Sequence, residues 1–205
     1  MKKKKILLLG KYIKKKSLNI SIYNFLKKNY ILCFANEFEN FKLKKYDLVV
    51  SYGYGKILNN SQIKKLGCNI INLHIGYLPF ARGIYPLVWS LVFFKPIGIS
   101  IHLIDNKKID SGPIIYKKKI NYNNKDTLKT IHLMCRKSLE KYFFDNFENH
   151  FLVRPKKTAL RNNNNYYFTK ENSKKLMIEL PDKWDTRVSY IKSNYKKLRK
   201  IYKNK

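Results

Sequence analysis

Acidic side chains are scarce in this chain of 205 residues, which carries 13 Asp and Glu against 44 Lys and Arg, a formal net charge of +31. Such an excess would ordinarily favour a nucleic acid or an acidic membrane as a partner. However, only six of the basic residues are Arg, which proteins prefer over Lys for binding phosphate and guanine. Lys, Asn, Ile, Tyr and Phe are all abundant, as AT-rich genomes favour. We therefore attribute the charge mainly to composition, with a functional basic surface as the alternative.

Cysteines and long apolar runs are also scarce. Cys33, Cys68 and Cys135 are odd in number and widely spaced, which argues against a disulfide framework and against a metal site. Because the first two lie in apolar runs, they suit a reducing compartment, and we expect a cytoplasmic protein without metal. The basic N-terminus precedes only four apolar residues, too few for a signal peptide. No stretch approaches the roughly 20 apolar residues of a membrane-spanning helix, so we expect no membrane span.

Short apolar segments alternate with helical patterns along most of the chain. Strands are expected at residues 6–9, 31–34, 47–52, 68–74, 98–104 and 114–120. Helices are expected at residues 17–28 with Ser17 as N-cap, at 61–66, from Pro86 to about Phe94, and after a cap at Asp126 or Thr127. This alternation predicts an α/β fold with a Rossmann-like, mostly parallel twisted sheet. We expect residues 1–150 to form the main domain and residues 151–205 a short C-terminal extension, with an aromatic segment and a basic helical tail from about Thr186.

Three polar fragments between residues 72 and 113 carry the chemical signal. They are residues 72–74 (Asn-Leu-His), 78–83 (Leu-Pro-Phe-Ala-Arg-Gly) and 109–113 (Ile-Asp-Ser-Gly-Pro). Asn72 and His74 are two apart on a strand, so their side chains point to the same face. They stand at the end of that strand, where open α/β sheets bind ligands. Asp110 follows the next strong strand, and it can face His74 if the two strands are neighbours.

These side chains suit the transfer of an acyl group to an amine, which creates an oxyanion and a cationic nitrogen. Asn72 can donate an amide N–H to the oxyanion, and losing one such donor typically costs about 10²–10³ in rate. His74 can move protons near neutral pH, and Asp110 can orient it and stabilise its charged form. Each residue alone is ordinary as a capping, turn or hydrogen-bonded structural residue. Their order around Leu-Pro-x-x-x-Gly favours the catalytic interpretation.

With these motifs the chain resembles the formyltransferases that use 10-formyltetrahydrofolate. That family includes glycinamide ribonucleotide formyltransferase, methionyl-tRNA formyltransferase and the nucleotide-sugar N-formyltransferases. The resemblance to the family's Asn-x-His, Leu-Pro-x-x-x-Gly and Asp-x-Gly motifs runs from about Tyr46 to Ile120. It implies that residues 1–150 are the catalytic domain, with a shortened N-terminal part. It also implies 10-formyltetrahydrofolate as co-substrate and Asn72, His74 and Asp110 as the catalytic trio.

The resemblance further implies a folate slot along residues 53–58, for which a plain strand-to-helix turn is the alternative. The loop at residues 105–110 would hold the pteridine. Here the chain reads Asp-Asn-Lys-Lys-Ile-Asp, one residue longer than the commoner Asp-Glu-Gly-Leu/Ile-Asp. The implied cofactor contacts are Tyr54, Lys56, Ile57, Leu58, Asp105 and Ile109.

The acceptor amine is assigned by resemblance to the nucleotide-sugar branch. Residues 83–90 (Gly-Ile-Tyr-Pro-Leu-Val-Trp-Ser) and the aromatic residues 166–170 are similar to segments of that branch. They imply a nucleotide-linked amino-deoxysugar, for example a dTDP-4-amino-4,6-dideoxyhexose. An aromatic ring could stack on its base or sugar, and Arg82 or Lys170 could pair with its diphosphate; hairpin packing is the alternative for the tyrosines. The implied substrate contacts are Tyr77, Arg82, Gly83, Tyr85, Trp89, Tyr166, Tyr167 and Lys170.

Other acceptors fit less well. Residues 10–17 lack the phosphate cradle expected of the glycinamide ribonucleotide branch. The methionyl-tRNA branch has an extra C-terminal domain, and the folate-hydrolysing branch an N-terminal regulatory domain, for which we expect no room. A different class of function is a degenerate fold that binds nucleic acid through its basic surface, with a steep dependence on salt. The intact trio argues against a nucleic-acid partner, and a homodimer is left open.

Overall fold

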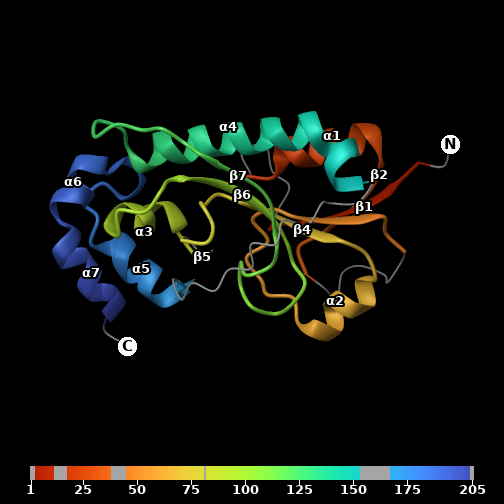
Figure 1. Ribbon diagram of the computed structural model, residues 1–205, viewed down its shortest axis with the longest axis horizontal. Coiled ribbons are helices and arrows are strands. Elements are labelled where there is room, and N and C mark those ends of the chain that lie inside the picture. The colour runs from red at the N-terminus through yellow and green to blue at the C-terminus, as the bar shows by residue number, and fades with distance from the viewer. Residues whose placement is uncertain (1–2, 12–17, 38–44, 81, 153–166, 204–205) are drawn as a thin grey trace. The chain divides into compact units, whose positions relative to one another are not determined.

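The computed structural model describes residues 3–11, 18–37, 45–80, 82–152 and 167–203 (Figure 1). The chain forms two compact units that alternate along the sequence. Unit 1 comprises Met1–His74, Ile101–Tyr116 and Glu140–Arg161, and unit 2 comprises Ile75–Ser100, Lys117–Leu139 and Asn162–Lys205. The expected division at residue 150 into a catalytic domain and an extension stays a prediction.

The main sheet has six strands in the order β2-β1-β3-β4-β6-β7. Four of them pair in parallel: β1 (Lys5–Leu9), β2 (Ile31–Ala35), β3 (Leu48–Ser51) and β4 (Ile70–His74). Beyond them lie β6 (Gly98–Leu103) and β7 (Ile114–Lys119). Backbone hydrogen bonds from Leu103 to Pro113 and from Ile120 to Ile97 show that β7 runs antiparallel to β6. The expected α/β fold with a mostly parallel sheet is therefore confirmed.

Near-continuous apolar runs form the inner strands because both faces of a parallel sheet are covered. Leu7, Leu8, Val49 and Val50 are fully buried. On unit 1, α1 (Ile20–Asn29) lies beside the C-terminal end of α4 (Leu128–Asn146) (Figure 1). There the ring of Phe25 packs against several other phenylalanines. These are Phe143, Phe144 and Phe147, with ring centroids 4.8–6.1 Å away.

Helix boundaries follow local capping chemistry. In α2 (Asn60–Leu66), Asn59 and Gln62 form a reciprocal capping box, and Gly67 ends the helix with a φ of 62°. The Thr127 hydroxyl oxygen accepts from the backbone N–H of Thr130 at 3.2 Å, so the cap expected at Thr127 precedes α4. The helix expected from residue 17 begins instead at Ile20, and Ser17 lies outside the described residues.

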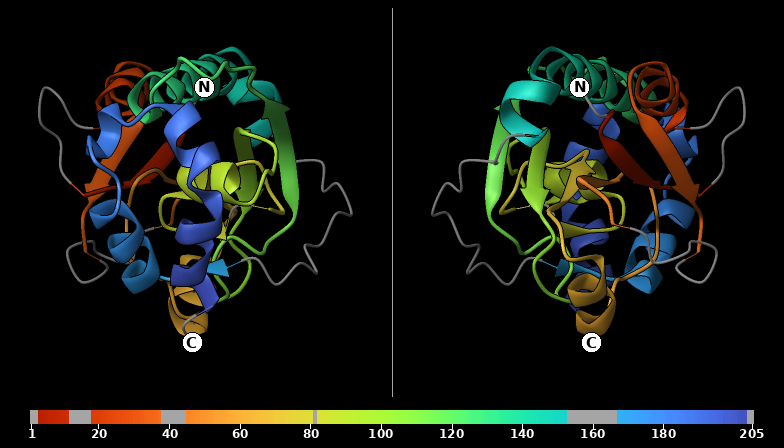
Figure 2. Two further views of the ribbon diagram at one scale, coloured as in Figure 1. Left: turned by 90° about the vertical axis from the view of Figure 1, so that its left-hand side faces the viewer. Right: turned by 90° about the vertical axis from the view of Figure 1, so that its right-hand side faces the viewer.

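The described part of unit 2 contains the N-terminal part of α4 and the short strands β5 (Arg82–Gly83) and β8 (Tyr167–Phe168), together with four further α-helices. They are α3 (Pro86–Val92), α5 (Lys170–Ile178), α6 (Val188–Ser193) and α7 (Tyr195–Lys203), seen in the left view of Figure 2. The basic tail expected to be one helix is therefore two, which meet at Asn194. Phe94, expected within the third helix, lies beyond its end and is 53% exposed. Within the described ranges, no helix combines the length and apolarity needed to cross a membrane.

Candidate active site

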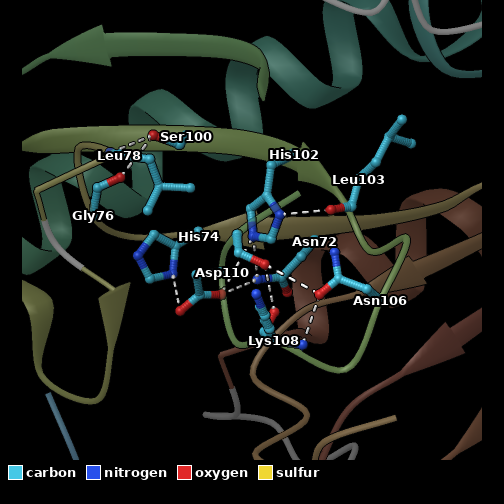
Figure 3. Close-up of polar contacts among 11 residues, drawn as sticks. Asn72, His74, Gly76, Leu78, Ser100, His102, Leu103, Asn106, Lys108 and Asp110 are labelled. Carbon is cyan, nitrogen blue, oxygen red and sulfur yellow. Dashed lines mark hydrogen bonds and ion pairs between the residues drawn. The ribbon is translucent and has the colours of Figure 1, made fainter. Parts of the chain in front are cut away.

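Three polar side chains meet at the ends of neighbouring strands in unit 1 (Figure 3). Asn72 and His74 come from β4, and Asp110 from the loop that follows β6. The Asn72 amide Nδ2 donates to Asp110 Oδ1 at 3.2 Å, and His74 Nδ1 lies 3.7 Å from Asp110 Oδ2. The side chains of His74 and Asp110 are only 8% and 10% exposed, so solvent screens their interaction little. The structure thus brings together the three residues that the sequence singled out.

The loop between β6 and β7 holds Asp110 despite its extra residue. The Asn106 side-chain oxygen accepts from the backbone N–H of Lys108 at 2.7 Å, which closes a tight turn. The backbone N–H of Lys107 donates to Asn60 Oδ1 at 3.1 Å and ties the turn to α2. Asp110 itself has a φ of 47°, a left-handed conformation that Asp tolerates better than most residues. This turn therefore anchors the loop to α2 before the chain reaches Asp110.

Gly112 is required where the chain leaves this loop. A Cβ at that position would collide with the backbone oxygen of Leu103, which accepts a hydrogen bond from the His102 ring. The glycine of the Asp-Ser-Gly fragment therefore allows the loop to return closely along the end of β6.

His102 is a member of the cluster that sequence reasoning missed. It lies on β6, is 1% exposed, and its Nδ1 is 2.9 Å from the backbone oxygen of Leu103. Its Nε2 is 3.1 Å from Asn72 Nδ2 and 3.3 Å from Asp110 Oδ1 (Figure 3). The signal was present in the sequence, because a histidine inside an otherwise apolar strand must find hydrogen-bond partners when it is buried.

Ser100, two residues before His102 on β6, was also missed. Its hydroxyl is fully buried, donates to the backbone oxygen of Gly76 at 2.9 Å, and accepts from the backbone N–H of Leu78 at 3.0 Å (Figure 3). The following peptide bond, Leu78-Pro79, is cis. Ser100 thus fixes the start of the Leu-Pro-x-x-x-Gly fragment against β6.

The family is settled by the extent of a sequence match. Residues 24–145, more than half of the chain, match the family model described as formyl transferase. The chain belongs to the formyl transferase family. The other predicted site residues can now be placed with that family in mind.

Similar proteins include different members of the family. Methionyl-tRNA formyltransferase of Thermodesulfovibrio yellowstonii is 38% identical over 42% of this chain and 28% of its own length. Phosphoribosylglycinamide formyltransferase of Bacillus subtilis is 31% identical over 51% of this chain and 54% of its own. The chain therefore spans about half or less of the length of these two curated relatives.

One solved structure is matched almost end to end. It is the formyltransferase PseJ from Anoxybacillus kamchatkensis in complex with UDP-4,6-dideoxy-4-formamido-L-AltNAc and tetrahydrofolate. The TM-score is 0.74 at 28% identity, and the match covers 91% of this chain and 97% of PseJ.

The segment predicted to line a folate slot divides into buried and exposed side chains. Tyr54 and Leu58 are 6% and 4% exposed and belong to the apolar core of unit 1. Ile57 is 60% exposed, and the ammonium of Lys56 lies 2.7 Å from the Glu37 carboxylate. In the following loop, Asp105 is exposed and Ile109 is half-buried. The cofactor contacts of all six residues stay predictions.

A two-stranded pairing brings together several residues predicted to bind the acceptor. Strands β5 and β8 pair in parallel, with Arg82 opposite Tyr167 and Gly83 opposite Phe168. A Cβ on Gly83, whose φ is 96°, would collide with the backbone oxygen of Phe168, so the pairing requires glycine. Directly after β8, Thr169 caps α5 by accepting from the backbone N–H of Asn172 at 3.1 Å, which places Lys170 in the first turn.

The remaining predicted acceptor residues lie in different surroundings. Tyr77 is half-buried, with the ammonium groups of Lys117 and Lys119 at 4.9 and 5.9 Å from its ring centroid. Tyr85 has a left-handed φ of 54° and meets Trp184 edge-on at 5.8 Å. Tyr166 lies outside the described residues.

Trp89 requires a correction. Its side chain is 0% exposed, stacks on Phe168 at 4.6 Å, and donates from Nε1 to the Ser173 hydroxyl at 2.9 Å. An enclosed ring of this kind cannot touch a bound substrate. It supports β8 from within unit 2, because the apolar spacing of α3 turns this face toward the core.

Proposed function

We propose that this chain transfers a formyl group from 10-formyltetrahydrofolate to the amine of a nucleotide-linked amino-deoxysugar. The observation that carries the proposal is the convergence of Asn72, His74 and Asp110, with contacts of 3.2 and 3.7 Å, at the ends of β4 and β6. The likeness to PseJ, whose structure contains a UDP-linked formamido sugar and tetrahydrofolate, supports the choice of donor and acceptor.

The chemistry follows from the charges that develop as the amine attacks the formyl carbon. The carbonyl oxygen becomes an oxyanion, which the Asn72 amide can stabilise by donating an N–H. His74 lies with Nδ1 3.7 Å from Asp110 Oδ2, and its imidazole can move protons near neutral pH as the charges develop. Asp110 carries the negative charge of the cluster and can accept the proton that the attacking amine releases, either directly or through a water molecule. The new C–N bond forms in the attack; the bond to the folate nitrogen then breaks, and that nitrogen takes up a proton, which completes the transfer.

Residues at the end of β3 and in the loop after β6 would hold the co-substrate. Ile57 offers an exposed apolar side chain beside the cation of Lys56, which suits a ligand with a flat ring system and carboxylates. Gly53 and Gly55, with φ values of 64° and 73°, shape the backbone between β3 and these side chains. When bound, 10-formyltetrahydrofolate supplies the activated formyl group. Tyr54, Leu58, Asp105 and Ile109 complete the proposed contacts.

Acceptor recognition is proposed for unit 2. There, Arg82 and Lys170 are two cations that suit a diphosphate, and Tyr167 an aromatic ring that suits a base or sugar. The pairing of β5 with β8 brings the segments that carry them together, although more than eighty residues separate them in the sequence.

A formyl-transfer assay read by mass spectrometry tests the proposal. The protein and 10-formyltetrahydrofolate would be incubated with dTDP-, UDP- and GDP-linked amino sugars, with glycinamide ribonucleotide and methionyl-tRNA as control acceptors. We expect a product heavier by one formyl group on at least one nucleotide sugar. Transfer only to a control acceptor would reassign the substrate. No transfer to any acceptor, with folate still bound, would contradict the proposal.

A further inference from the structure

We infer that His102 is a positioning residue, whose ring tautomer determines which edge of the Asn72 amide faces Asp110. The inference rests on the proposed function, because it assigns His102 to the support of a catalytic amide. It is carried by three contacts of the imidazole ring with Leu103, Asn72 and Asp110 (Figure 3).

The backbone carbonyl of Leu103 selects the tautomer of His102. A carbonyl oxygen only accepts hydrogen bonds, so the contact of 2.9 Å requires a hydrogen on His102 Nδ1. In the neutral ring, Nε2 then has no hydrogen and acts as an acceptor. The ring is 1% exposed, so bulk water does not reach this atom.

The side-chain amide of Asn72 presents its donor nitrogen to that acceptor. Its amide nitrogen only donates, and it faces two acceptors, His102 Nε2 at 3.1 Å and Asp110 Oδ1 at 3.2 Å. Turning the amide over would place its oxygen against both acceptors with no hydrogen between them. That orientation is disfavoured because each buried acceptor would be left without a donor. His102 and Asp110 together therefore fix the nitrogen edge of Asn72 toward the cluster.

The same geometry keeps one donor of Asn72 available. The amide nitrogen, His102 Nε2 and Asp110 Oδ1 form a triangle with sides of 3.1, 3.2 and 3.3 Å. Seen from the nitrogen, the two acceptors are close enough to share a single N–H as a three-centre bond. The second N–H, which diverges widely from the first, is then left to donate to the developing oxyanion.

A second proton on His102 would remove this arrangement. Nε2–H would turn from an acceptor into a donor toward Asp110, and it would repel the Asn72 N–H. The titratable groups that face the ring are Asp110 at 3.3 Å and His74, whose ring centroid is 6.2 Å away. The neutral ring with hydrogen on Nδ1 is therefore the form that positions Asn72.

The first experiment reads the tautomer directly and does not depend on turnover. Long-range ¹H–¹⁵N NMR of the ¹⁵N-histidine-labelled protein at pH 8 reports which ring nitrogen carries hydrogen in each of the four histidines. The His102 signals are assigned by their loss in His102→Gln. We expect hydrogen on Nδ1 alone. Hydrogen on Nε2, or on both nitrogens, would overturn the inference.

The second experiment separates positioning from simple packing. In His102→Leu the acceptor is lost, and we expect kcat to fall about 10²-fold with little change in the KM for either substrate, because transition-state stabilisation is lost. In His102→Gln an amide oxygen can accept from Asn72, so we expect at least about tenfold of that loss to be recovered. Equal loss in folded Leu and Gln variants, or a loss confined to KM, would show a merely structural role.

A matched control and a fallback keep the two proposals distinguishable. His132 lies on α4 and packs against Trp184 at 5.3 Å, so His132→Leu should leave kcat unchanged. If His102→Leu does not fold, the tautomer and the His102→Gln rate still decide. If the unaltered protein transfers no formyl group, the proposed function is refuted. The NMR result would still decide the tautomer of His102, because it does not depend on turnover.

Discussion

The strand-end cluster of unit 1 and the β5–β8 segment of unit 2 are built in different ways. In the cluster of Asn72, His74, His102 and Asp110, polar side chains from β4, β6 and the following loop are held by hydrogen bonds from the Asn72 amide to His102 and Asp110. In the β5–β8 segment, position is set by backbone pairing, by a glycine that admits no Cβ, and by aromatic stacking on Trp89. Substitutions of polar side chains in the first region should therefore change the rate of formyl transfer. Substitutions that disturb the backbone pairing in the second region should change stability and acceptor affinity.

The largest expected effect is in the strand-end cluster. His74→Asn should lower kcat by about 10²–10⁴-fold, the usual contribution of a general acid or base, while leaving the fold intact. Rates would be measured by mass spectrometry and folding by circular dichroism. The matched control is His150→Asn, because His150 is exposed and its ring contacts the Tyr142 hydroxyl at 3.0 Å. A folded His74→Asn protein that kept most of its rate would refute the proposed mechanism.

The next effect tests backbone fit in the β5–β8 segment. Gly83→Ala should destabilise the protein by about 2–3 kcal/mol, because the added Cβ collides with Phe168 and strains a positive φ. Gly67→Ala is the control, since Gly67 also has a positive φ but nothing within 4 Å of the added Cβ. Denaturant titration of both variants gives the free energies of unfolding. Equal losses would mean that strain alone, and not the close approach of β8, requires glycine at position 83.

A smaller effect tests acceptor binding. Lys170→Ala should raise the KM for the nucleotide sugar about tenfold with little change in kcat, as expected for one charge-assisted hydrogen bond to a diphosphate. Lys174→Ala, which removes an exposed cation one turn further along α5, should leave KM unchanged. Steady-state kinetics at two salt concentrations would compare them. The same KM for both variants would remove Lys170 from the acceptor site.

The smallest effect is a pH dependence of stability that arises from a residue of neither region. Burial, together with the nearby Arg136 cation, lowers the pKa of His132 below its ordinary value of 6.5. The unfolded chain therefore binds a proton more readily than the folded one, and stability should decline as pH falls through about 6.5. Thermal unfolding between pH 8 and pH 5 should show a shallower decline in His132→Leu. An identical decline in both proteins would assign it to other groups.

Short-range patterns predicted much of the sheet and the trio. The alternation of apolar segments with helical patterns predicted the strand boundaries to within about two residues. This worked because strands buried on both faces of a parallel sheet consist of nearly continuous apolar residues. The two-residue spacing of Asn72 and His74 predicted that their side chains point to the same face of the sheet, because successive side chains of a strand alternate between its two faces. Gly67 directly follows the helix expected at residues 61–66, and it ends α2 because glycine readily adopts the left-handed conformation that ends helices.

Only the tertiary structure decided which distant groups meet. His102 looked like one residue of an apolar strand until the sheet order placed β6 beside β4 and gave its ring Asn72 and Asp110 as partners. Trp89 was predicted at the substrate, yet its packing against Phe168, 79 positions later in the sequence, encloses it. Local patterns specify the conformation and face of a segment because those depend on neighbours a few residues away. The tertiary partners of a segment depend on how the whole chain packs, and a short stretch of sequence does not determine that packing.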